Sequence, residues 1–270
     1  MWQQDTIFRF GRKTFGIIAF LVAAAAAFPT PAATEQGAAT PNVAEQYLLA
    51  AANQDRAQRG LPPLHRDPVL AQAALYHARQ MAAHANISHQ FPGEPDLSVR
   101  GASAGARFSL ITENVAEAPD SAMIHDLWMH SKGHRENLLD PNVDSVGISV
   151  VARNHQFFAV EDFAHTVKAL SFNEQETTVA SLLEQSGLEV DGKYISVEDA
   201  RRTCTMSTGY AGRRRPWFIM RYTAGRLSEL PSELQSRLNS GKYHEAAVGA
   251  CVSTDSSPFS AYNIAVLLYP

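Results

Sequence analysis

The chain is poor in cysteine and carries no excess of positive charge. Cys204 and Cys251 are the only cysteines among 270 residues, so one internal disulfide is the most that the chain can form. The 23 Lys and Arg residues are outnumbered by 27 Asp and Glu, which argues against a nucleic-acid-binding surface. The length is sufficient for two ordinary domains, and the apolar content of 45% is enough to form their cores.

The chain also lacks an apolar run long enough to span a bilayer. Its longest run, 15–28, has 14 residues, whereas a spanning helix needs about 20. The basic residues Arg9, Arg12 and Lys13 precede this run, and the small residues Ala32 and Ala33 follow it. This order is typical of a secretory signal, which we predict over 1–33, with a flexible leader at 34–42. An uncleaved N-terminal anchor is the alternative, and export to the periplasm or the medium follows from either.

Export bears on the two cysteines. An oxidising compartment permits a Cys204–Cys251 disulfide, which would add roughly 4 kcal/mol on the chain-entropy model. Two buried thiols are the alternative.

The pattern of apolar residues predicts an α+β chain. Asp67 is a plausible cap for a helix that begins at Pro68, and Gly60 with two prolines ends the helix before it. The predicted helices are 43–59, 68 onward, 97–103, 121–129, 174–186 and 230–238. The predicted strands are 146–151, 157–163, 217–222, 246–252 and 262–269. The run 247–251 weakly echoes 145–149, which indicates a second hairpin rather than a repeat.

Several short motifs occur in a recognisable order. Ser88-His89 comes first, Glu113-Asn114-Val115-Ala116 follows, and then a helix carrying Trp128 leads to Gly133-His134-Arg135-Glu136-Asn137 and a hairpin. In this order and spacing the motifs resemble the CAP superfamily of cysteine-rich secretory proteins, antigen 5 and plant pathogenesis-related proteins, and its bacterial secreted branch in particular. The resemblance implies an α-β-α sandwich over 43–168. A small α+β module of no recognised family would follow at 169–270.

The resemblance also implies a site. In the family, two His and two Glu line a cleft, and His89, Glu113 and His134 match three of these positions. Ser131 stands where the second Glu is expected. Trp128 and Asn137 would brace the cleft, and Glu161 on the last strand would lie near it.

Two imidazoles and one carboxylate could hold Zn²⁺ with water as the fourth ligand, through His89, His134 and Glu113. Ca²⁺ would need more oxygen ligands than this set supplies. A cleft without a tightly bound metal and a purely structural hydrogen-bond cluster both stay open.

These features favour a secreted binding module for an extracellular lipid, cell-wall component or protein. A peptide or ester hydrolase using metal-bound water or acid–base catalysis at the same cleft is the alternative. The sequence leaves open whether the protein is an enzyme.

Other motifs have simpler interpretations. His130 and His134 share a helical spacing, but Gly133 is expected to break the helix between them. The run 101–105 matches a nucleophile-elbow pattern around Ser103, yet no strand is predicted before it, so its small residues suit close helix packing instead. His77 is expected to be a hydrogen-bonded core residue. The side chains expected in solvent are His65, His125, His155 and the turn 213–215.

Overall fold

The computed structural model describes residues 40–190, 192, 195–253 and 257–270. The predicted signal, most of the predicted leader and the proposed anchor segment lie outside the described residues. Within the described ranges, no helix combines the length and the apolar character that a membrane span needs.

The first part of the chain forms a four-stranded sheet in the order β1-β3-β4-β2. β1 pairs in parallel with β3, and the other pairs are antiparallel. The strands are β1 (His65–Arg66), β2 (Phe108–Ala118), β3 (Ser145–Arg153) and β4 (Gln156–Thr166). β2 is therefore an edge strand, which positions the candidate site described below.

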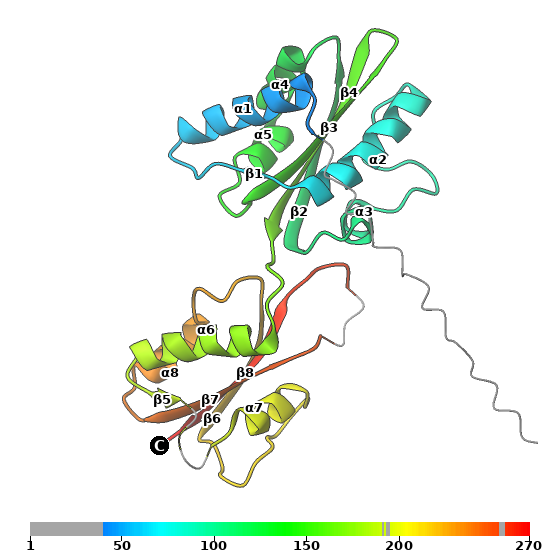
Figure 1. Cartoon of the computed structure of the whole chain (residues 1–270). Helices are drawn as coiled ribbons and strands as arrows, with labels where there is room; N and C mark the ends of the chain where they lie inside the picture. Colours follow the sequence, from blue (N-terminus) through cyan, green and yellow to red (C-terminus); the bar gives the residue numbers. More distant parts are fainter. Residues whose placement is uncertain (1–39, 191, 193–194, 254–256) are drawn as a thin grey trace, which may run out of the picture. The chain divides into compact units, whose positions relative to one another are not determined.

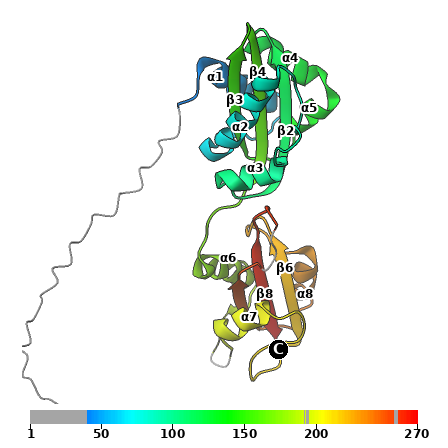
Figure 2. The same cartoon turned by 90° about the vertical axis from the view of Figure 1, so that its right-hand side faces the viewer.

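Helices cover both faces of this sheet, as Figures 1 and 2 show. One face carries α1 (Val43–Ala57), α4 (Ser121–His130) and α5 (Lys132–Leu138). The other face carries α2 (Pro68–His84) and α3 (Leu97–Ala104). The arrangement is the expected α-β-α sandwich.

Local signals set the helix starts. The side chain of Asp67 accepts hydrogen bonds from the backbone N–H groups of Val69 and Leu70, and Pro68 occupies the first turn. Asn42 and Glu45 form a capping box at the start of α1. The predicted starts at 43 and 68 are confirmed.

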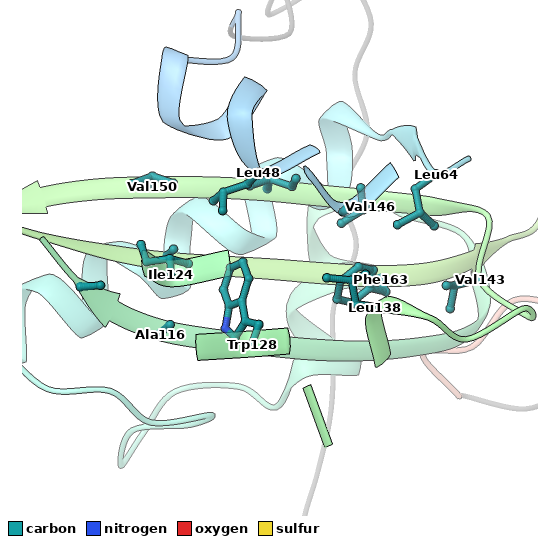
Figure 3. Close-up of a cluster of buried hydrophobic side chains, with 14 residues drawn as sticks. Leu48, Leu64, Ala116, Ile124, Trp128, Leu138, Val143, Val146, Val150 and Phe163 are labelled. Atoms are coloured by element: carbon teal, nitrogen blue, oxygen red, sulfur yellow. The ribbon is translucent and has the colours of Figure 1, made fainter. Parts of the chain in front are cut away.

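The core between α1, α4, α5 and the sheet surrounds Trp128 (Figure 3). Trp128, Leu48 and Phe163 are fully buried, and burial of each such side chain contributes about 1.5–3 kcal/mol or more. Neither cysteine lies in this part of the chain, so apolar packing holds it together.

The second part of the chain forms another four-stranded sheet, in the order β5-β7-β8-β6. Its strands are β5 (Glu189–Val190), β6 (Phe218–Ala224), β7 (Glu245–Cys251) and β8 (Tyr262–Tyr269). Its helices are α6 (Phe172–Gln185), α7 (Val197–Cys204) and α8 (Ser232–Leu238). A disulfide joins Cys204 to Cys251, as the sequence predicted, so the two-thiol alternative is wrong.

Three local expectations need correction. The helix around Trp128 ends at His130, and α5 already includes Gly133, so the break falls at Ser131 rather than at Gly133. The helical spacing also predicts Leu127 on the same side of this helix as Ile124 and Trp128, but Leu127 is 47% exposed and does not share their buried side. The strand β2 and the helix α7 were absent from the expected elements.

Candidate functional site

The site begins at the edge strand β2, where successive side chains point to opposite faces of the sheet. Glu113 points to the face that carries α2 and α3, and its side chain is only 3% exposed. Asn114 points to the opposite face and is fully buried. Because β2 is the last strand of this sheet in the described part of the chain, segments from both faces meet at this edge.

The buried carboxylate of Glu113 holds two cationic side chains. Nδ1 of His89 donates to Oε1 of Glu113 at 2.9 Å, and the guanidinium of Arg100 donates to Oε2. Arg100 comes from α3, is 4% exposed and also donates to the carbonyls of His89 and Pro95. The His89 side chain is 62% exposed, so this cluster reaches solvent through one imidazole.

His134 approaches the same edge from α5. Its ring centroid lies 6.5 Å from that of His89. Asn114 Nδ2 donates to the His134 carbonyl at 3.0 Å, and Asn137 Nδ2 donates to the Glu113 carbonyl at 3.2 Å. These amides fix α5 against β2, which brings His89, Glu113 and His134 together. Ser131 lies at the junction of α4 and α5 and is half-buried.

Two further carboxyls lie on β4 next to β2. Asp162 is the register partner of Glu113, and Glu161 is the partner of Asn114, so the two acids point to opposite faces. Both are fully buried, and their oxygens have no hydrogen-bond partner among the described residues. Burial, with the negative charge of Glu113, raises the pKa of Asp162, and burial raises the pKa of Glu161 to about 8.

A third imidazole is buried beneath the cluster. His77 on α2 is fully buried, with Nδ1 2.7 Å from Oε1 of Glu94 and Nε2 2.6 Å from the Ser88 carbonyl. Both ring nitrogens thus lie within hydrogen-bond distance of an oxygen atom. The expectation of a hydrogen-bonded core histidine at position 77 is confirmed.

The pKa values of His89 and His134 shift in opposite directions. The hydrogen bond to Glu113 raises the pKa of His89. Burial, together with the charge of nearby His89, lowers the pKa of His134. His89 therefore holds its proton to higher pH than His134 does.

Comparisons with known proteins bear on the first part of the chain. The model of the CAP family, described as the cysteine-rich secretory protein family, matches residues 49–163. This part of the chain is a CAP domain. The uncharacterized protein YkwD of Bacillus subtilis is 30% identical over 110 residues, which are 40% of this chain and 42% of that protein. The chain thus spans about two fifths of the length of this curated relative.

Solved structures show the same partial overlap. An extracellular protein from Bacillus anthracis that contains an SCP domain is 27% identical, over 46% of this chain and 40% of that one, with a TM-score of 0.43. A cysteine-rich secretory protein from Staphylococcus aureus is 23% identical, over 46% and 39% of the two chains, with a TM-score of 0.39.

The residues of this CAP domain do not fit a metal centre. His89 and Arg100 engage the two oxygens of Glu113, and the adjacent guanidinium would repel a cation. Ser131 supplies no carboxylate, and no group of three or more His, Cys, Asp or Glu side chains in the described ranges could hold an ion. In the described residues, His89, Glu113 and His134 are therefore not arranged as the ligands of a Zn²⁺ ion.

The remaining motifs lie elsewhere or are structural. Ser103 lies inside α3, with no elbow, and a Cβ added at Gly101 would stand 2.9 Å from the Phe108 ring, as close helix packing requires. His125 is not solvated as expected, because its side chain is 12% exposed and its Nε2 lies 2.8 Å from Asp55. His130 is exposed and pairs with Asp126 on its own helix.

Three members of the cluster were not predicted, namely Glu94, Arg100 and Asp162. None has a fixed spacing from a motif. Asp162 directly follows Glu161, and only the strand register shows which of the two faces Glu113. Trp128 lies in the core on the α4 side, and Glu161 lies across the sheet from Glu113.

Proposed function

We propose that the CAP domain is an extracellular binding module whose ligand enters the cleft at His89, Glu113, Ser131 and His134. The observation that carries this proposal is the exposed imidazole of His89, which is held at Nδ1 by a buried carboxylate. Nε2 of the ring then has no protein partner in the described part of the chain and can donate to a ligand.

The chemistry favours an anionic or strongly polar group. Glu113 stabilises the protonated form of His89, and His134 adds a neutral donor or acceptor beside it. Such a group could belong to a lipid headgroup, a cell-wall polymer or a protein. Binding should weaken as the pH rises through the raised pKa of His89, because the imidazolium charge is then lost.

The test is a binding screen with the purified full chain at micromolar concentration. The probes are phosphatidylglycerol vesicles, phosphatidylcholine vesicles as their neutral match, insoluble peptidoglycan and a panel of secreted proteins. Glu113→Gln and His134→Ala should each weaken binding about tenfold or more, and Glu136→Gln on the exposed side of α5 should not. Binding that ignores both cleft variants, or no binding to any probe, contradicts the proposal.

Acid–base hydrolysis at the same cleft is the second candidate. It is favoured by the opposite pKa shifts, since a neutral His134 could accept a proton while a protonated His89 donates one. His134→Ala should then abolish turnover of peptide or ester substrates with nearly unchanged melting temperature. A purely structural cluster predicts instead a loss of about 1–3 kcal/mol in folding stability. Turnover that survives His134→Ala contradicts the assignment of the site.

Export of the chain stays a proposal as well. It is supported by the N-terminal pattern and by the extracellular SCP-domain relative. Recovery of the chain from the medium or periplasm with its N-terminus near residue 34 would test it, and retention in the cytoplasm would contradict it.

A further inference from the structure

We infer that residues 171–269 are a second copy of the CAP-type fold, in which the polar cluster of the first copy has been replaced. The two sheets have the same topology. The short strands β1 and β5 pair in parallel with β3 and β7, which are the first strands of the two hairpins. The strands β2 and β6 pair antiparallel with β4 and β8, which are the second strands of the hairpins. The orders β1-β3-β4-β2 and β5-β7-β8-β6 correspond strand for strand.

The helices correspond too. α1 and α6 each precede the short strand, and α2 and α7 each follow it. α6 and α8 pack on one face of the second sheet and α7 on the other, which repeats the division between α1, α4, α5 and α2 in the first. α1 and α6 both begin with a capping box. One feature without a counterpart is α3.

Both copies need a glycine where the second helix crosses the hairpin. A Cβ added at Gly147 would lie 2.2 Å from the carbonyl carbon of Leu70, and one added at Gly249 would lie 2.2 Å from that of Ala200. A side chain at either position would collide with helix backbone. The weak echo of 145–149 in 247–251 therefore marks equivalent positions, which corrects the expectation of a hairpin without a repeat.

Helix and hairpin are also linked near these glycines, by a different contact in each copy. Two residues after Gly147, Ser149 donates to the Ala71 carbonyl of α2, and two residues after Gly249, Cys251 forms its disulfide with Cys204 of α7. A glutamate of the first helix accepts a backbone N–H of the hairpin in each copy, at positions that are not equivalent. Glu45 accepts that of Val150 at 3.1 Å, and Glu176 accepts that of Ala250 at 2.9 Å.

The copies differ at the site. The row across the first sheet is Gly147, Asp162, Glu113, and the equivalent row of the second sheet is Gly249, Ala265, Arg221. Arg221 stands in the place of Glu113 and donates to the carbonyls of Thr203 and Gly209. No acid pair faces α7 in this row.

This difference deepens the proposed function of the cleft. The glycine and the capping box occur at matching positions in both copies, so they belong to the fold. The cluster of Glu113, Asp162 and His89 occurs in one copy only, and the fold forms without it in the other. The cluster therefore serves the cleft rather than the fold, and the second copy does not bind the ligand of the first.

The equivalence predicts a new crosslink. Leu70 and Ala200 are equivalent, because each lies against the glycine of its hairpin. Cys204 lies four residues after Ala200, so its counterpart is Ala74, four residues after Leu70. The counterpart of Cys251, two residues after Gly249, is Ser149. The Cα atoms of the natural pair are 5.8 Å apart. The full chain with Ala74→Cys and Ser149→Cys should form a second disulfide in a glutathione buffer, in which oxidised glutathione takes up the two electrons and two protons as two reduced molecules.

Mass spectrometry of an unreduced digest measures the link between positions 74 and 149. The control pairs Ala78→Cys with Ser149→Cys, four residues or about 6 Å further along α2, and should keep free thiols. Free thiols at 74 and 149 in the folded chain would overturn the equivalence. This experiment needs no ligand, so its failure is distinguishable from a failure of the binding screen.

A second measurement tests the equivalence even if the chain with Ala74→Cys and Ser149→Cys does not fold. Gly147→Ala and Gly249→Ala should each lower the melting temperature by several degrees, whereas Gly133→Ala, which meets nothing within 4 Å, should not. A Gly249→Ala chain as stable as its parent would also overturn the proposed equivalence.

Discussion

At the residue scale, the candidate site depends on charge balance in a buried place. The carboxylate of Glu113 could not be buried without its cationic partners, because an isolated buried charge costs far more than one hydrogen bond returns. Arg100 and His89 supply these partners from two segments that follow α2. The result is a site in which only His89 extends well into solvent.

Replacement of Arg100 should expose this dependence. Arg100→Met leaves Glu113 buried without its guanidinium and should lower the free energy of unfolding by about 3–5 kcal/mol. Urea denaturation at neutral pH measures the change. Lys132→Ala removes an exposed partner of Glu136, at 3.8 Å, and is expected to change little. Equal effects of the two substitutions would show that Arg100 is not a buried partner.

At the element scale, β2 and β4 decide which acid faces which side of the sheet. Alternation sends Glu113 and Asp162 toward α2, and Asn114 and Glu161 toward α5. A shift of one residue in this register would exchange the two sets. The cleft therefore depends on strand pairing as much as on its motifs.

The buried Glu161 predicts a specific pH dependence. Its pKa is about 8 in the folded chain and near 4.5 when unfolded, so the unfolded chain loses a proton that the folded chain keeps between these values. Its contribution to stability is full below pH 4.5 and falls as the pH rises to about 8. Glu161→Gln should be more stable than the parent at pH 8, by ~1 kcal/mol or more, and similar at pH 4. Thermal melts from pH 4 to 8 test this, and parallel curves would contradict it.

Sequence reasoning worked where the signal was local. The start of α2 followed from Asp67 and Pro68, because a cap and a first-turn proline act within one turn. β2 was missed because its polar residues Thr112, Glu113 and Asn114 interrupt the apolar alternation of a strand. α7 was missed because it carries four charged residues among eight. The family resemblance pointed to His89, Glu113 and His134, but Arg100 and Asp162 join them only through tertiary contacts.

At the scale of the whole molecule, one fold occurs twice, and the second helix of each copy is linked to its hairpin by a different interaction. The first copy uses the hydrogen bond of Ser149, and the second uses a disulfide. The second copy has shorter helices to pack on its sheet and so buries less apolar surface. A covalent link therefore contributes a larger share of its free energy of unfolding.

Loss of the disulfide should therefore weaken the second copy. The Cys204→Ala, Cys251→Ala chain should lose about 2–5 kcal/mol of stability, because the link closes a loop between residues 47 apart. Urea denaturation followed at Trp217 fluorescence measures this loss. An unchanged midpoint would contradict the expected contribution.

The boundary between the predicted domains, at 168 and 169, stays a proposal. Lys168 lies in a non-helical, non-strand segment and is exposed. Brief trypsin treatment of the folded chain should cut after Lys168 before it cuts within either sheet. Early cleavage inside 43–167 or 171–269 would argue against the boundary.

The most direct test of the account is the pH titration of the His89 and His134 ring protons by NMR. We expect the pKa of His89 to lie above the usual value of about 6.5 and that of His134 below it, and we expect Glu113→Gln to lower the pKa of His89. Glu136→Gln should leave both values unchanged. Two imidazoles with the same ordinary pKa, indifferent to Glu113→Gln, would contradict a site in which these three residues meet.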